Sequence, residues 1–371
     1  MSFYDAIRVG ASGASTGYEV ERSLRFNHTD STELKRTVSS TGNQKVWTWS
    51  AWFKRWGLHD DGGTSYLFSC EPHSGNNGIA ALYIQSDQIY TYFDTTGSNP
   101  YGAVNDRKYR DVSAWMHIVW QVDAANTTQR IWINGVEETL ASGNNPPDYA
   151  YGMNESGQPM MIGSSGNWGA SQSNTYFAEI HYSDGNKYAA SDFAETDATT
   201  GQWVPKKSPA ITYGTNGFYL NFSDNSGTTA TTLGKDSSGN GNNFTPYNFS
   251  VSQGLGNDSM KDTPTNNFAT FNATLPAASS STYSNGALEF SCSSTGQKRT
   301  GSTFAHDSGK WYAEFKLESY SSASGSYPYI GVASNAETEP GSGESNTWIG
   351  YLGTAINSAG TAWNKGSVIS G

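Results

Sequence analysis

The chain has 371 residues, which is enough for about two domains of roughly 150 residues each. Only 15% of its residues are charged, against a usual value of about 25%, whereas 13% are aromatic and 41 are glycine. This composition favours pleated sheet and turns over helix, so we expect an all-β protein. The net charge of −11 has the wrong sign for neutralising phosphates and argues against nucleic acid as a partner.

Targeting signals and paired cysteines are not expected. Apolar stretches such as residues 79–84 (IAALYI) fall far short of the roughly 18 residues that span a bilayer. The N-terminal sequence has no apolar segment behind a basic start, so we expect neither a secretion signal nor membrane insertion. Cys70 and Cys292 are far apart in the sequence and are expected to stay unpaired, as in a reducing cytosol.

Residues 1–20 stand apart from the rest of the chain. They are rich in glycine and serine, and their few apolar side chains cannot form a core: Phe3, Tyr4, Ile7 and Val9. One interpretation is a frayed terminus. The other is an anchor that becomes ordered on a partner.

Period-two alternation recurs through the next two hundred residues, and helical periodicity does not. The clearest strand is residues 116–123, with Met116, Ile118, Trp120 and Val122 on its buried face. Asn134-Gly135 between two extended runs predicts a hairpin over residues 129–140, because both turn positions need a positive φ. A single helical turn is expected near residues 190–195. The other predicted strands are residues 22–27, 46–53, 66–70, 80–85, 88–93, 159–163 and 175–183.

The composition changes from about Ser223 to Ser281, where Asn, Ser, Thr, Gly and Pro dominate. We interpret this stretch as an irregular connector with one or two strands, such as 217–222 at its edge. A second β module is expected to begin near Tyr283. Its predicted strands are residues 310–318, 328–333 and 347–352, with Trp311, Ala313, Phe315 and Leu317 sharing one face of the first.

The order of segments in the first half resembles a laminin-G-like, concanavalin-A-like jelly roll. The segments that carry the resemblance are SLRFN, WTWSAWFKR, AWMHIVWQVD, RIWINGVEE, MMIGSS and AEIHYSDG. The W-x-H strand, the I-x-I-N-G hairpin and the closing A-E-I strand follow one another as in that family, over roughly Tyr18 to Phe193.

The continuation resembles a narrower group, the structural proteins of marine tailed phages, especially cyanophages. GFYLNFSDNSG, KDSSGNGNNFTPYNFS and DTPTNNFATFN are similar to the segment that joins the jelly roll to a SPRY-like module in that group. SGKWYAEFKLE, YIGVAS and WIGYL resemble the first strands of the SPRY-like module, whose later strands are missing by Gly371. The resemblance implies four parts: an anchoring segment (1–20), a jelly roll (21–222), a connector (223–281) and a partial SPRY-like β module (282–371).

Enzymatic motifs are sought and not found, so we expect a protein that is not an enzyme. The laminarinase-like pattern E-x-D-x-x-E has its nearest match at Glu195 and Asp197, but Thr200 stands where the third acid belongs. Gly13 to Gly17 fits G-x-S-x-G without the strand and helix that a nucleophile elbow needs. His117 and His181 are expected to be sheet residues, because no histidine shows metal-ligand spacing.

Two weaker ligand sites follow from loop composition. Laminin-G-like modules often hold calcium in Asp- and Asn-rich rim loops, and the corresponding candidates here are Asp60, Asp61, Asn76 and Asn77. Turn chemistry alone also explains these residues. Aromatic side chains in predicted loops could stack on sugar rings. These candidates are Trp56, Tyr101, Tyr149 and Trp168.

The resemblance implies a virion structural protein, assembled in the host cytoplasm. The leading interpretation is a tail fibre or tail-associated adhesin that presents a lectin-like module to host surface polysaccharide. A head fibre or capsid decoration protein, a spacer without a ligand, and a polysaccharide depolymerase remain alternatives. The implied partners are other virion proteins, contacted through residues 1–20, and further copies of the chain, with a trimer expected.

Overall fold

The structure is a computed structural model. It describes residues 18–58, 63–70, 78–95, 101–141, 145–165, 172–274, 281–292, 300–306, 308, 312–316, 318–319, 329–333, 348–352, 361–364 and 367–369. The chain divides into two compact units, Met1–Phe304 and Ala305–Gly371, which are described separately.

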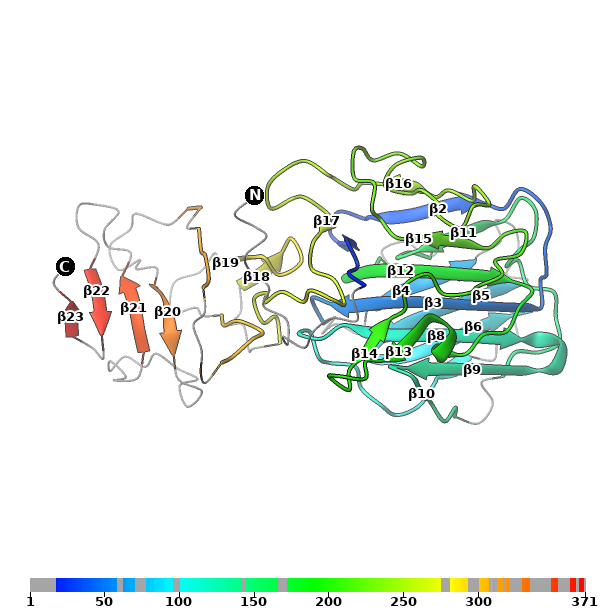
Figure 1. Ribbon diagram of the computed structural model, residues 1–371, viewed down its shortest axis with the longest axis horizontal. Helices are drawn as coiled ribbons and strands as arrows, with labels where there is room; N and C mark the ends of the chain where they lie inside the picture. Colours follow the sequence, from blue (N-terminus) through cyan, green and yellow to red (C-terminus); the bar gives the residue numbers. More distant parts are fainter. Residues whose placement is uncertain are drawn as a thin grey trace. The chain divides into compact units, whose positions relative to one another are not determined.

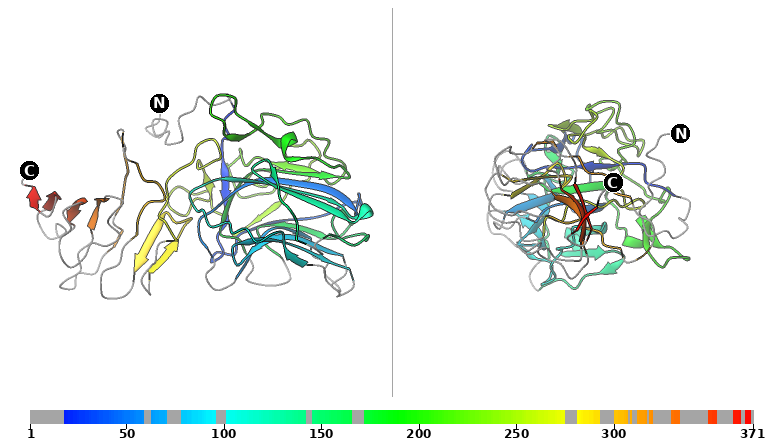
Figure 2. Two further views of the ribbon diagram at one scale, coloured as in Figure 1. Left: turned by 90° about the horizontal axis from the view of Figure 1, so that it is seen from below. Right: turned by 90° about the vertical axis from the view of Figure 1, so that its left-hand side faces the viewer.

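Two antiparallel sheets form the first unit, and Figure 1 shows one of them in front of the fainter strands of the other. The turned view in Figure 2 shows the same two sheets as layers. The first sheet contains, in order, β10 (Val136–Glu137), β9 (Thr128–Ile133), β8 (Met116–Asp123), β3 (Val46–Arg55), β12 (Thr175–Asp184), β1 (Ser23–Arg25) and β17 (Ser259–Met260), with β15 (Phe218–Leu220) beside β12. The second contains β16 (Thr245–Tyr247), β2 (Glu33–Thr37), β11 (Pro159–Ile162), β4 (Thr64–Cys70), β5 (Ile79–Gln85), β6 (Gln88–Asp94) and β7 (Tyr101–Ala103).

The main core lies between the two sheets, where alternate residues of both sheets interdigitate. Trp49 of β3 stacks on Phe68 of β4, with ring centroids 5.5 Å apart, and so joins the two layers. Trp47 packs edge-on against Trp120 of β8 at 5.9 Å. This architecture is the concanavalin-A-like, laminin-G-like jelly roll, and the all-β prediction is confirmed.

Most strands predicted in the first half are present within one or two residues. The Asn134-Gly135 turn is confirmed, since both residues have positive φ (48° and 81°) between β9 and β10. The hairpin is shorter than predicted, because β10 ends at Glu137.

The first sheet is covered on its outer face as well. The single-turn α1 (Ala190–Phe193) and the hairpin β13 (Ala194–Thr196) and β14 (Trp203–Pro205) follow β12. Phe193 of α1 and Trp203 of β14 pack on Val119 and Trp132 of this face. A second outer cluster surrounds Trp52, Trp115 and Tyr176. Every residue of β12 is therefore buried, although the strand contains polar as well as apolar residues.

Residues 223–281 were predicted to be an irregular connector with one or two strands. Two short strands are present in the described residues 223–274, but this stretch packs into the sandwich instead of only linking two modules. β16 pairs with β2 and β17 pairs with β1, so this stretch adds a strand to each sheet. Phe244 and Phe249 lie in the main core. A few well-spaced apolar residues are enough here, because the sandwich already supplies the rest of the core, and buried polar contacts fix the segment in place.

Two buried ion pairs attach that segment to the first sheet. The Arg25 guanidinium contacts the Asp258 carboxylate at 3.0 Å, and Lys54 Nζ contacts Asp262 Oδ2 at 2.9 Å. Both basic side chains are 1% exposed or less. Removing one partner of such a pair leaves a costly buried charge.

The start of the second module also differs from the prediction. The hairpin of β18 (Ser281–Ser284) and β19 (Glu289–Cys292) belongs to the first unit, because its turn contacts the first sheet. Arg25 donates to the Asn285 carbonyl, and the Tyr176 hydroxyl donates to the Gly286 carbonyl. Gly286 has φ +69°, and a Cβ there would lie 2.1 Å from the Tyr176 hydroxyl.

The second unit contains a four-stranded antiparallel meander of β20 (Tyr329–Ala333), β21 (Trp348–Leu352), β22 (Thr361–Asn364) and β23 (Ser367–Ile369). The two strands predicted at 328–333 and 347–352 are confirmed. The strand predicted at 310–318 is wrong for residues 312–316, which are not in a strand, and Phe315 is 48% exposed. Alternation alone does not make a strand, because a strand also needs a partner strand to complete its ladder of hydrogen bonds. Trp311 and Leu317 lie outside the described residues.

Replacing Trp120 by alanine should lower the free energy of unfolding of the first unit by about 3–5 kcal/mol, the usual range for truncating a buried aromatic residue. The Trp120 side chain is fully buried, and its Nε1 donates to Gln129 Oε1 at 2.8 Å. Urea denaturation measures the change. Tyr247→Ala serves as a control, because Tyr247 is 44% exposed and should change stability little. A Trp120→Ala effect as small as the control's would contradict this assignment of the core.

Candidate functional site

The sequence-predicted aromatic candidates do not form one site. Trp56 was expected in an exposed loop, and this is wrong: it is 4% exposed, and its Nε1 donates to the Phe26 carbonyl at 2.8 Å. Its ring therefore offers no face to a sugar. Tyr149 is half-buried against the core and packs edge-on on Tyr151. Tyr101 lies on β7 in register with Tyr92.

The remaining predicted residues lie outside the described part of the chain. They are Trp168 and the calcium candidates Asp60, Asp61, Asn76 and Asn77. Among the residues that the structure does describe, no group of three or more His, Cys, Asp or Glu side chains is arranged to hold a metal ion. The described helices include none with the length and apolar character of a membrane-spanning segment.

A serine and a histidine meet on the outer face of the first sheet without forming a nucleophilic pair. His117 Nε2 lies 2.8 Å from Ser50 Oγ, and Trp203 Nε1 donates to His117 Nδ1 at 3.1 Å. Because Nδ1 accepts, the proton of the neutral ring is on Nε2, and the histidine donates to the serine. Burial lowers the pKa of His117 to about 3, so the ring stays neutral. His117 and His181 are sheet residues, as predicted.

Glu179 is the buried carboxyl group of a β-bulge in β12. The pairing with β3 shifts register between Ala178 and His181, and Glu179 has φ +50°, a conformation that bulges impose. Its Oε2 accepts hydrogen bonds from the Tyr18 and Tyr219 hydroxyls at 2.9 and 2.8 Å. Burial raises the pKa of this carboxyl to about 7. A glycosidase needs a second carboxyl across the scissile bond, whereas the two groups that hydrogen-bond to Glu179 Oε2 are tyrosine hydroxyls.

Glu179 should make the protein less stable as the pH rises from about 4.5 to 7. The folded state keeps the proton up to about pH 7, whereas the unfolded chain releases it near the ordinary value of 4.5. The folded state therefore binds more protons in this window, and stability falls with pH by up to about 3 kcal/mol. Glu179→Gln should flatten this part of the stability profile, measured by urea denaturation at several pH values.

The exposed Glu195 provides the matched control, because Glu195→Gln removes a carboxyl that is not buried. Its profile should follow that of the wild type. Equal slopes for Glu179→Gln and the wild type between pH 4.5 and 7 would show that Glu179 is not the source of the dependence.

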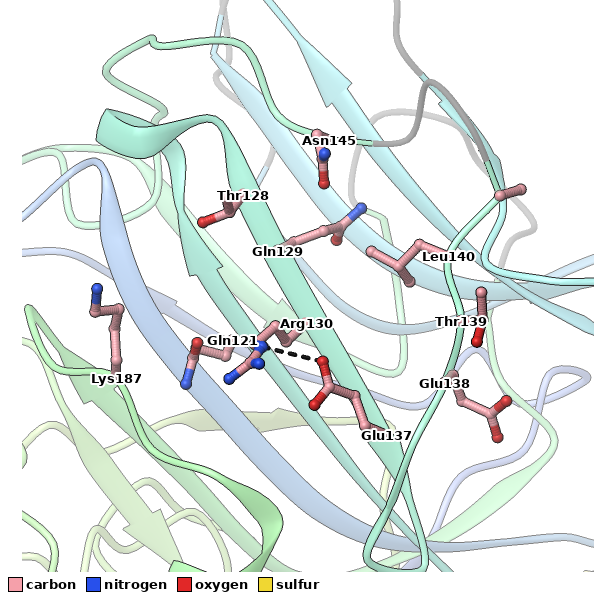
Figure 3. A pocket seen from close by; sticks show the side chains of 11 residues that line it. Gln121, Thr128, Gln129, Arg130, Glu137, Glu138, Thr139, Leu140, Asn145 and Lys187 are labelled. Carbon is pink, nitrogen blue, oxygen red and sulfur yellow. Dashed lines mark ion pairs between the residues drawn. The ribbon is translucent and has the colours of Figure 1, made fainter.

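A polar groove lies at the edge of the first sheet, and its origin is local. β10 pairs only with Trp132 and Ile133, and the last contact of this hairpin is Glu138 N–H to the Ile131 carbonyl. The chain then leaves the sheet. Among the described residues, the Thr128–Arg130 half of β9 has no strand on that side, and the space between it and the departing chain is the groove (Figure 3).

The groove has a volume of about 800 Å³, within the size range of small-molecule sites. Figure 3 shows its side chains coming from β8, β9, the departing chain and the loop after β12. Nearly all of them carry hydrogen-bonding groups. The lining consists of Gln121, Thr128, Gln129, Arg130, Glu137, Glu138, Thr139, Leu140, Ala141, Asn145 and Lys187.

The charges in the groove are balanced by ion pairs. Arg130 Nε contacts Glu137 Oε1 at 3.0 Å, and both side chains are about half exposed. Lys187 Nζ contacts Asp123 Oδ2 at 2.7 Å. Burial acts to raise the pKa of Asp123, but the hydrogen bonds from Lys187 and Asn126 hold it below its usual value. The groove thus presents both donors and acceptors without a large net charge.

A group of tyrosines on the second sheet is less accessible to a ligand than the groove is. Tyr66, Tyr83 and Tyr90 stack ring on ring across β4, β5 and β6, with centroids 5.2 and 5.4 Å apart. Tyr66 and Tyr83 are only 2% and 7% exposed. Because their faces cover one another, they do not form an open stacking platform.

Sequence reasoning missed the groove. Its strands and hairpin were predicted, but the predicted hairpin extended to residue 140, which would have closed the space beside β9. The charged run Glu137-Glu138, which begins at the last residue of β10, was the available signal, because such a run favours solvent over a sheet interior.

Comparison with known proteins supports the fold of the first unit. Residues 26–186 match the family model described as the concanavalin A-like lectin/glucanases superfamily. No curated protein sequence matches the chain. All groove residues except Lys187 fall within the matched stretch.

Similar solved structures are distant. A native heptameric SAP-like pentraxin from Limulus polyphemus is 14% identical, with a TM-score of 0.36 over 52% of this chain and 94% of that one. Domains LG4-5 of the mouse laminin alpha1 chain are 12% identical (TM-score 0.33, 57% and 50%). The enzymatically active domain of bacteriophage CBA120 tailspike protein 2 is 12% identical (TM-score 0.35, 46% and 26%). This chain spans only half of the laminin fragment and about a quarter of the tailspike, and scores this low carry no conclusion on function. The family match of residues 26–186 places the first unit among proteins with the concanavalin A-like lectin fold.

Proposed function

We propose that the first unit binds carbohydrate in the polar groove beside β9. The observation that carries the proposal is the lining itself, in which guanidinium, carboxylate, carboxamide and hydroxyl groups from several segments converge on one space of about 800 Å³. Sugar hydroxyls both donate and accept hydrogen bonds, and such a lining serves both roles. The match of residues 26–186 to a lectin and glucanase family supports this ligand class.

The ligand is a neutral glycan rather than a polyanion. Arg130 and Lys187 are each already paired with a carboxylate, so the groove has no surplus of positive charge for sulfate or carboxylate groups. The ion pair of Arg130 is exposed and contributes little to stability. Its groups can therefore turn to a ligand hydroxyl at small cost.

The positions of the two groove carboxylates, Glu137 and Glu138, support binding of the glycan without hydrolysis. Glu137 and Glu138 are consecutive residues of an extended segment, so their side chains point to opposite sides and do not face each other across a bond. Glu137 pairs with Arg130, and Glu138 accepts from Arg107 and Asn105, both at 2.6 Å. A retaining or inverting glycosidase needs two carboxyls that flank the same sugar.

In the wider proposal, the chain is a tail fibre or tail-associated adhesin of a phage virion. Its support is the sequence resemblance to structural proteins of marine tailed phages, together with the lectin fold of residues 26–186. A single open groove binds weakly, but several copies on one particle convert later contacts into intramolecular ones. Residues 1–20 would attach the chain to the virion, and a trimer is the proposed assembly. Peptide mapping of purified particles tests whether the chain is part of the virion. Its detection in a tail fraction would support an adhesin, and its detection in a capsid fraction would support a decoration protein.

Arg130→Ala should weaken glycan binding about tenfold, since losing one hydrogen bond to a charged group removes roughly 1.5 kcal/mol. Stability should fall by less than about 1 kcal/mol, because the Arg130–Glu137 pair is exposed. A glycan array screen identifies the ligand, and titration calorimetry then compares the variants.

Arg110→Ala is the matched control. Arg110 is also an exposed arginine in an ion pair, with Asp87, but it lies outside the groove. Its affinity should equal that of the wild type. Unchanged affinity in Arg130→Ala would show that the binding site lies elsewhere. Release of reducing ends from the bound glycan would favour a depolymerase.

A further inference from the structure

A lysine, an aspartate and an asparagine meet on the outer face of the first sheet. Lys54 of β3 is fully buried, and its Nζ donates to Asp262 Oδ2 (2.9 Å), Asn267 Oδ1 (2.7 Å) and the Phe268 carbonyl (2.9 Å). The other oxygen of Asp262 accepts from Trp115 Nε1 at 2.8 Å. Each of the three ammonium hydrogens thus has an acceptor, and one of these acceptors is the side-chain carboxamide oxygen of Asn267.

The carboxamide of Asn267 is held in one orientation. Its Nδ2 donates to the Ser113 carbonyl at 2.7 Å, which leaves Oδ1 facing Lys54. Because Oδ1 is bonded to Cγ, the lysine nitrogen lies roughly 3–4 Å from that carbon. This separation overlaps the roughly 3–3.5 Å of a near-attack arrangement, and the amine reaches the face of the carboxamide by turning away from the lone-pair direction of Oδ1.

The surroundings of the pair are dry and apolar. Lys54 and Asp262 lie beside the outer cluster of Trp52, Trp115 and Tyr176, where little water reaches them. Lys54 Nζ and Asp262 Oδ2 are 2.9 Å apart, so one proton can pass directly from the ammonium to the carboxylate, which turns the two buried charges into two neutral groups. The transfer also frees the lone pair of the amine. Asn267 is partly exposed, which gives a leaving group a path to solvent.

We propose that Lys54 and Asn267 form an intramolecular isopeptide bond, with Asp262 as the proton carrier. The neutral Nζ attacks Cγ of Asn267, a new C–N bond forms, and the bond from Cγ to Nδ2 breaks. One proton of the attacking amine passes through Asp262 to Nδ2, which leaves as ammonia. The lysine ammonium and the carboxamide thus become a secondary amide and an ammonium ion in solution, and Asp262 returns to its carboxylate. No oxidant or cofactor takes part.

The bond has a structural consequence that does not depend on glycan binding. It would join β3, at the centre of the first sheet, to the segment after β17. A covalent link between residues so far apart in sequence restricts the unfolded chain, as a long-range disulfide does. The covering segment would then stay on the sheet under load, as an attachment protein requires.

Intact-mass spectrometry of the denatured full chain tests the inference directly. The expected mass is that of the sequence minus one ammonia, and a protease digest should contain a branched peptide joining Lys54 to Asn267. Lys54→Arg, which keeps the charge but cannot form this amide, should restore the full mass, as should Asn267→Ala. Asp262→Asn should greatly slow the reaction.

Lys45→Arg is the matched control, because Lys45 is an exposed lysine in an ion pair with Asp148. This variant should keep the mass loss and the branched peptide. The wild-type result decides the matter even if a variant fails to fold. A wild-type chain of full mass would overturn the inference, and so would an ammonia loss that maps to the Asn134-Gly135 turn without a branched peptide.

Discussion

The fold depends on one constraint, which is that the first sheet must be buried on both faces. From Trp47 to Arg55 every residue of β3 is buried, and so is every residue of β12. The inner face packs on the second sheet in the usual way of a sandwich. The outer face carries Trp52 and Trp132, which would be a large exposed apolar patch if nothing covered it. The chain after β12 provides that cover.

This constraint explains why the sequence predicted the strands of the first half well but not the role of the second half. Alternation in the segment WTWSAWFKR correctly places Trp47 and Trp49 inward. The same alternation places Thr48, Ser50 and Lys54 on the opposite face, which a local pattern would assign to solvent. In the structure these polar groups are buried because specific partners meet them, such as Asp262 for Lys54. A partner more than two hundred residues away cannot be read from a local pattern.

The candidate site shows the same limit in another form. The hairpin around Asn134-Gly135 was predictable, because its turn chemistry is local. The groove depends on where β10 stops pairing and where the loop after β12 places Lys187, and neither follows from the hairpin itself. Trp56 was misplaced for a related reason, since its indole N–H donates to the carbonyl of Phe26, which directly follows β1 and lies 30 residues away in the sequence. The groove therefore combines a local hairpin end with Lys187 from a distant loop, whereas the proposed isopeptide bond depends entirely on long-range contacts of the first sheet.

Calorimetric unfolding of two fragments, residues 18–304 and residues 18–222, tests the two-sided burial of this sheet most directly. The account predicts one cooperative transition for the longer fragment, with equal calorimetric and van't Hoff enthalpies. The shorter fragment lacks the segment that holds Arg25 and Lys54, and it should unfold at a much lower temperature or fail to show a cooperative transition. Equal melting temperatures for the two fragments would show that residues 223–304 are an accessory to the sandwich, and this would contradict the account.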